Sequence, residues 1–150
     1  MSNNSNDDRF VYLVFTAQNR LRMYIRDELM AAKVKITLVQ AGILFLLREK
    51  DGRAMSELGQ HLSLDNSTIT GLTDRLEKEG FVRRQVNPKD RRISLIHITP
   101  EGIQEINQAK TIINRINNEI KADFSREEID AFKKILNSFV GKFKKKEKGL

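Results

Sequence analysis

The sequence predicts a mainly α-helical fold with one small β-hairpin (α+β), and three observations lead to this prediction. Residues 55–62 and 66–79 have the apolar spacing of two short helices joined by a tight turn. Two extended runs, 81–86 and 93–98, follow directly and enclose a charged tip at 87–92. Long amphipathic segments precede and follow this unit. Together these features predict a winged helix-turn-helix with dimerisation helices at its N- and C-terminal ends.

The composition narrows the class of protein. The 150-residue chain is long enough for one domain, and its formal net charge of +7 favours an anionic partner such as nucleic acid or an acidic membrane surface. The absence of cysteine excludes disulfides, thiolate metal sites and cysteine redox sensing. The N-terminus lacks the apolar core of a signal peptide, and no apolar run approaches the ~20 residues that span a bilayer. We therefore expect a cytoplasmic protein.

The segment before the helix-turn-helix predicts two helices. Apolar residues recur at three- and four-residue steps over 10–29, which predicts one long amphipathic helix after a disordered tail at 1–8. Thr37 and Gln40 form a capping box, so a second helix should begin at Leu38. This helix is apolar on nearly every side, and we expect it to be buried.

The helix at 66–79 is the predicted recognition helix. Asp65 is placed to accept hydrogen bonds from the free amides of its first turn. Small and polar side chains lie away from its apolar stripe, so this face is slim enough to enter the major groove of DNA and exchange hydrogen bonds with bases and phosphates. These residues are Ser67, Thr68, Thr70, Thr73 and Asp74. A purely solvent-exposed face is the alternative.

The alternation of apolar and polar residues along the hairpin strands is partly ambiguous. Ile96 and Ile98 are predicted to face inward, whereas Ile93 and Leu95 stay undecided because both alternating sets contain apolar residues.

Helix-start signals place two further helices after the hairpin. Thr99 followed by Pro100 predicts a long helix, and the capping box of Ser125 and Glu128 predicts a last one. The basic tail at 144–150 is either a solvated terminus or a weak contact to DNA phosphates.

The outer helices predict a dimer. Each carries more apolar surface than a winged helix can cover, and a second copy of the chain would cover it around a two-fold axis. Two recognition helices would then meet half-sites roughly 10 bp apart in a pseudo-palindromic operator. The expected organisation is a tail at 1–8, an N-terminal dimerisation helix at 9–34, a DNA-binding domain at 35–99, C-terminal dimerisation helices at 100–143 and a basic tail at 144–150.

These residues resemble the MarR family of bacterial transcriptional regulators over nearly the whole chain, from Phe10 to about Val140. The resemblance is carried by STITGLTDRLEKEGFVRR at 67–84, DRR at 90–92 and LIHITPEG at 95–102. It implies a homodimeric regulator of transcription that binds double-stranded DNA, either a repressor, which is favoured, or an activator.

The resemblance also implies roles for single residues. Arg92 of the family's Asp-x-Arg wing motif would enter the minor groove, held in place by Asp90, because a guanidinium is attracted to the potential of a narrow A·T-rich groove. Arg75 would contact a phosphate or, with Asp74, brace the wing. Asn66 at the start of the recognition helix joins the candidate DNA contacts. Further phosphate candidates are Lys78, Arg83, Arg84, Lys89 and Arg91.

Gly71 departs from the family pattern, since many relatives carry arginine at this position. A glycine in mid-helix costs about 1 kcal/mol relative to alanine and removes a long base-reading side chain. Either the helix backbone approaches DNA more closely, or specificity rests on Thr70, Thr73 and the wing.

An effector is a weaker expectation. The resemblance implies release from DNA by a small aromatic or phenolic ligand, with Phe15, Tyr24 and Phe45 on the helices that would line its pocket, although aromatic residues at helical spacing are usually core. His61 and His97 are the only histidines, too few for the convergent ligands of a zinc sensor, so neither a metal nor a cofactor is expected.

Two other functions remain open at this point. One is a weakly specific architectural DNA-binding protein, and the other is a winged helix used for protein contacts. An enzyme is not expected, because the sequence has no nucleophile elbow, phosphate loop or metal-ligand cluster.

Overall fold

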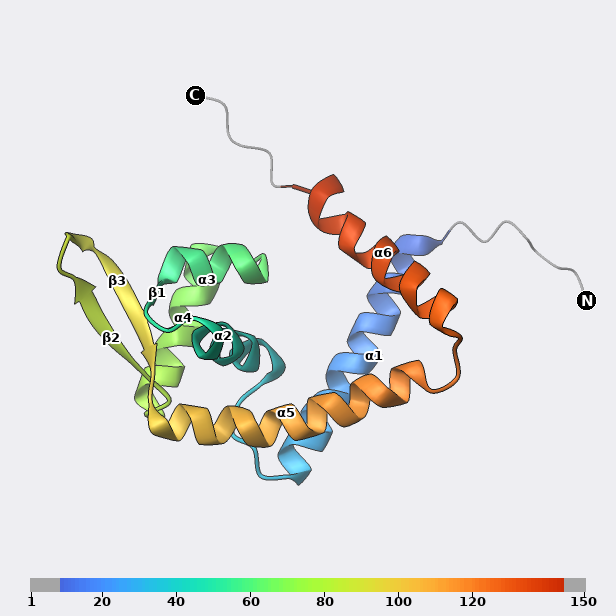
Figure 1. Ribbon diagram of the computed structural model, residues 1–150, viewed down its shortest axis with the longest axis horizontal. Coiled ribbons are helices and arrows are strands. Elements are labelled where there is room, and N and C mark those ends of the chain that lie inside the picture. Colours follow the sequence, from blue (N-terminus) through green and yellow to red (C-terminus); the bar gives the residue numbers. More distant parts are fainter. Residues whose placement is uncertain (1–8, 145–150) are drawn as a thin grey trace, which may run out of the picture. The chain divides into compact units, whose positions relative to one another are not determined.

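The computed structural model describes residues 9–144, which divide into one unit up to Ile113 and a second from Asn114 onward. Figure 1 shows the order of the helices and strands along the chain. Their bounds are α1 (Phe10–Ala31), α2 (Leu38–Glu49), β1 (Arg53–Ala54), α3 (Met55–Leu62), α4 (Asn66–Lys78), β2 (Val82–Asn87), β3 (Asp90–Ile98), α5 (Pro100–Lys121) and α6 (Arg126–Lys142). The predicted tail at 1–8 and most of the basic tail lie outside the described residues.

The capping box predicted for α2 is confirmed. The backbone N–H of Gln40 donates to Thr37 Oγ1 at 3.3 Å, and the backbone N–H of Thr37 donates to Gln40 Oε1 at 2.9 Å. These bonds satisfy amides that a helix start otherwise leaves without partners, so α2 begins at Leu38 as predicted. Ile43 and Leu44 are fully buried, which explains why this helix is apolar on nearly every side.

The helix-turn-helix also follows the prediction. Ser63 adopts the left-handed conformation (φ 55°) between α3 and α4, and Asp65 caps α4 by accepting from the backbone N–H of Thr68 at 2.8 Å. Leu58 of α3 and Ile69 of α4 are buried in the core. The apolar stripes of the two helices therefore form the centre of the unit.

The hairpin belongs to a three-stranded sheet of order β1-β3-β2. Figure 1 shows its two long strands, β2 and β3, side by side. Strand β1 was missed because two residues carry no alternation signal; its Arg53 pairs with Ile96 of β3. The predicted tip was too long, since β3 already begins at Asp90. Residue Asn87 pairs with Asp90 after an irregularity at Val86, so only Pro88 and Lys89 connect the strands.

The inward face of β3 agrees with the prediction. Ile96 is fully buried and Ile98 is half-buried. Of the two ambiguous residues, Ile93 is 36% exposed, whereas Leu95 is half-buried like Ile98. The strand therefore resolves the ambiguity for Ile93 alone.

The start of α5 is fastened to the end of α4. Thr99 Oγ1 donates to the carbonyl of Gly80 at 2.6 Å and accepts from the backbone N–H of Gly102 at 3.1 Å. The backbone N–H of Thr99 donates to the carbonyl of Phe81 at 3.0 Å. Gly102 is buried, and a Cβ atom there would overlap the Phe81 carbonyl oxygen. Only glycine permits this backbone contact.

The second unit contains the end of α5 and all of α6. The predicted capping box at its turn is confirmed, with Ser125 and Glu128 each accepting from the other's backbone N–H. No described residue of α6 is buried. Its exposed large apolar residues are Phe132, Ile135, Leu136 and Val140, and Phe143, also exposed, follows directly after the helix. Within residues 9–144 no helix is long and apolar enough to cross a membrane.

We predict that Gly102→Ala lowers the free energy of unfolding by about 1–3 kcal/mol or more, because the new methyl group must push the backbone of Phe81 away. Urea unfolding at one fixed protein concentration measures the change. Gly141→Ala is the matched control, since a Cβ atom at that helical glycine meets no atom within 4 Å. Equal stability of the Gly102→Ala variant and the wild type would contradict this packing.

Candidate nucleic-acid interface

The exposed face of α4 is a continuous helical surface. Ser67, Gly71, Arg75 and Lys78 are exposed and follow one another at steps of four, four and three residues, which places them on one side of a helix. Asn66 and Thr68 are also exposed at its N-terminal end, and Asp74 lies at its edge. This face offers small polar groups toward the start of the helix and cations toward its end. We call it the α4 face.

Thr73 does not belong to the α4 face, contrary to the prediction. It is fully buried, and its hydroxyl donates to the carbonyl of Ile69 at 2.7 Å. The reason is its spacing, because positions 69, 73 and 76 lie on the same apolar side of the helix. Thr70 is half-buried, and its hydroxyl donates to the Asn66 carbonyl at 2.7 Å. Neither threonine is placed as a principal base reader.

The wing presents an ordered arginine near its tip. Asp90 Oδ1 accepts from Arg92 Nε at 3.1 Å and from the Arg92 backbone N–H at 3.1 Å, while Asp90 Oδ2 accepts from Arg92 Nη2 at 3.1 Å. The side chain of Arg92 is nevertheless 89% exposed. The hydrogen bonds from the Arg92 side chain, and then from its backbone, lower the pKa of Asp90 below its ordinary value. Lys89 and Arg91 are exposed beside this pair.

Arg84 is engaged within the protein. It forms an ion pair with Asp74 of α4, and its Nε lies 3.7 Å from a carboxylate oxygen of Glu77. Its side chain is only 27% exposed, whereas Arg83 beside it on β2 is exposed. The family resemblance had implied that Arg84 contacts a phosphate, and that Arg75 either contacts a phosphate or braces the wing with Asp74. In the structure Asp74 does hold the wing, but through Arg84, which joins β2 to α4.

The two histidines have structural contacts. His97 Nδ1 lies 3.2 Å from Asp51 Oδ2, and His61 Nε2 lies 3.4 Å from the guanidinium of Arg53. Among residues 9–144 no three His, Asp or Glu side chains gather as they would around a metal ion.

The three aromatic pocket candidates occupy different environments. Phe15 and Tyr24 on α1 are 59% and 41% exposed, whereas Phe45 on α2 is half-buried. None of them lines the pocket of about 700 Å³ that lies within the second unit, between the end of α5 and α6.

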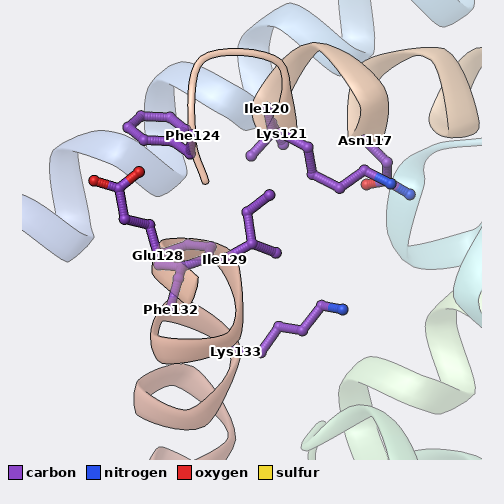
Figure 2. A pocket seen from close by; sticks show the side chains of 8 residues that line it. All are labelled: Asn117, Ile120, Lys121, Phe124, Glu128, Ile129, Phe132 and Lys133. Atoms are coloured by element: carbon purple, nitrogen blue, oxygen red, sulfur yellow. The ribbon is translucent and has the colours of Figure 1, made fainter. Parts of the chain in front are cut away.

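The second-unit pocket has apolar walls and a basic side. Ile120, Phe124 and Phe132 line it together with Ile129, while Lys121 and Lys133 lie on one side, as Figure 2 shows. The sequence pattern did not single out this pocket, because helical spacing alone cannot tell an apolar position that is covered from one that is open.

We predict that Arg92→Ala raises the pKa of Asp90 toward its ordinary value of 3.8, because the hydrogen bonds that favour the carboxylate are lost with the side chain. An NMR titration of the Asp90 carboxyl carbon measures the shift. Because the pKa of Asp90 is lowered, its carboxylate is fully ionised and paired with Arg92 at pH values above the ordinary pKa of 3.8. The pairing is lost as the pH falls through the lowered pKa. Above about pH 5, the Asp90 signal should therefore not change with pH. Arg91→Ala is the control. Identical titration of Asp90 in the wild type and both variants would refute the pairing.

Comparison with known proteins agrees with this geometry. The model of the MarR family matches residues 36–94. The helix-turn-helix transcriptional regulator YsmB of Bacillus subtilis, itself uncharacterized, is 34% identical over 100 residues, which cover 67% of this chain and 68% of YsmB. The chain spans only about half the length of several other curated relatives.

Solved structures show the same fold. The transcriptional repressor CouR of Rhodococcus jostii, bound to a 23-mer DNA duplex, superposes with a TM-score of 0.79 at 25% identity, over 87% of this chain and 92% of CouR. A probable transcriptional regulator of Pseudomonas aeruginosa superposes with a TM-score of 0.76 at 26% identity, over 89% of this chain and 98% of its own. Because the family model matches residues 36–94 and the chain covers 68% of YsmB at 34% identity, the chain belongs to the MarR family of transcriptional regulators.

Proposed function

We propose that this protein is a sequence-specific DNA-binding regulator, most simply a repressor, that binds a pseudo-palindromic operator as a homodimer. The observation that carries the proposal is the link between the α4 face and the wing. Arg84 of β2 pairs with Asp74 of α4, so the two elements that would contact DNA are held together before DNA arrives. The similarity to CouR, a repressor bound to DNA, supports the same role for this chain.

The two elements would read different grooves. The α4 face would enter the major groove, where Ser67 and Thr68 can exchange hydrogen bonds with base edges and Arg75 and Lys78 can contact phosphates. Arg92, exposed yet oriented by Asp90, would enter the narrow minor groove beside it. The remaining cations of the wing would contact the backbone of the duplex.

A second copy of the chain is the proposed cover of the outer helices. Six successive apolar residues at the start of α1 are exposed, and so is the apolar side of α6. Such a surface is large for a protein that stays monomeric. The apolar walls of the second-unit pocket (Figure 2) continue the α6 side, so the partner would fill it as well.

Regulation by a small aromatic or phenolic ligand is part of the proposal, with Phe15, Tyr24 and Phe45 as its candidate contacts. Tyr24 is 41% exposed and lies outside the six-residue stretch of α1 that the partner would cover. A panel of simple phenols that leaves the operator complex intact at millimolar concentration would contradict this part alone.

Selection of genomic fragments by the purified protein tests the central proposal. We expect a two-fold motif whose half-sites lie roughly 10 bp apart, bound about 10³-fold more tightly than random DNA at physiological salt. Similar affinity for all fragments would instead indicate an architectural DNA-binding protein. No affinity for DNA, together with capture of an acidic protein, would indicate a protein-interaction module.

We predict that Arg92→Ala weakens operator binding by about tenfold or more, because a groove contact made by an oriented arginine is lost. Fluorescence anisotropy with the selected duplex measures the affinity. Lys110→Ala, which removes an exposed cation of α5 outside the α4 face and the wing, should change it by less than about twofold. Equal losses in the two variants would argue against a wing contact.

We predict that Phe132→Glu converts a dimer into a monomer. Phe132 is 53% exposed in the single chain, and the glutamate that replaces it would place a charge in the buried interface. Light scattering at micromolar concentration should show the mass fall from twice 17.3 kDa to 17.3 kDa. Asn137→Glu adds the same charge at another exposed α6 position and serves as the control. A monomeric wild-type protein would overturn the dimer.

A further inference from the structure

Gly71 occupies the centre of the α4 face. It is exposed between Ser67 and Arg75, one helical turn from each. Lys78 lies two turns after Gly71 on the same face. The side chains next to it in sequence do not fill the space above it, since Thr70 is half-buried and its hydroxyl is bonded to the Asn66 carbonyl. The middle of the α4 face is therefore bare backbone.

The fold itself gives no reason for glycine at this position. A Cβ atom built on Gly71 meets no atom within 4 Å, and its φ is not positive, so any L-residue fits here. Other glycines of the unit differ in this respect. A Cβ atom on Gly59 would lie 3.1 Å from the Leu64 carbonyl oxygen, and Gly52 and Gly80 have positive φ. Gly71 instead weakens its own helix through the greater freedom of the unfolded chain.

We propose that Gly71 is a specificity-determining residue at which the backbone of α4 comes into direct contact with one base pair in the major groove. The inference rests on the proposed function. The absence of a side chain lets the helix sit deeper in the groove by the thickness of a methyl group. Ser67 and Arg75, one turn to either side, then reach the neighbouring base edges and phosphates. Glycine at position 71 therefore favours close contact with DNA, although it makes α4 less stable than alanine would.

The test compares Gly71→Ala with Gly141→Ala in the full chain. Gly141 is a matched control, because it is an exposed helical glycine of α6 whose added Cβ atom also meets nothing within 4 Å. The probes are the consensus duplex that the wild type selects from a random duplex pool, and a scrambled duplex of the same composition. Thermal unfolding is measured in parallel, with light scattering to confirm that both variants keep the assembly of the wild type.

We expect opposite effects on stability and on operator affinity. Gly71→Ala should raise the melting temperature by about 2–4 °C and weaken binding to the consensus duplex by about tenfold. Its affinity for the scrambled duplex should stay the same, since the phosphate contacts remain. Gly141→Ala should bind both duplexes as the wild type does.

Binding of the consensus duplex by Gly71→Ala with a loss below about threefold would overturn the inference while leaving the proposed function intact. Parallel losses on both duplexes would also overturn it, because the effect would then not concern a base pair. A wild-type protein that selects no consensus would instead remove the proposed function, and the inference with it.

Discussion

The backbone contact between Phe81 and Gly102 is the constraint on which the helix-turn-helix and the wing depend. Four elements meet there, because Gly80 and Phe81 connect α4 to β2, while Thr99 connects β3 to α5 and Gly102 lies in the first turn of α5. The absence of a side chain at Gly102 lets the first turn of α5 lie directly on the Phe81 carbonyl. Both α4 and the wing therefore start from this contact, and the Arg84–Asp74 pair joins them again further along β2.

Much of this fold follows from local signals in the sequence. The capping boxes at Thr37 and Ser125 and the N-cap at Asp65 predict helix starts correctly, since each depends on residues three positions apart. Strand β1 was missed because its pairing with β3 is a long-range contact that two residues cannot signal. Ser67, Thr68 and Asp74 are exposed on α4 as the sequence predicted, whereas Thr70 is half-buried and Thr73 is fully buried. The polarity of Thr73 concealed its place on the apolar side of the helix.

Some of the arginines form ion pairs within the protein, whereas other cations remain exposed on its surface. Arg53, 9% exposed, donates from Nε to the Leu46 carbonyl at 3.0 Å and lies within 3.7 Å of Glu49 and Glu57 carboxylates, so it ties β1 to α2 and α3. Arg84 likewise neutralises acids of α4. Sequence alone cannot tell such internal cations from phosphate contacts, because the distinction lies in tertiary neighbours. The outward positive field of the unit comes from the cations that remain on the α4 face and the wing.

Whether α4 and the wing contact one duplex together can be measured directly by hydroxyl-radical footprinting of the selected operator, which reports protection along the minor groove. We expect two symmetric minor-groove protections that flank the half-sites. When Arg92 is replaced by alanine, these protections should be lost, while the major-groove contacts, followed with dimethyl sulfate, should persist. Uniform protection along the duplex, or a minor-groove pattern that does not change in that variant, would contradict it.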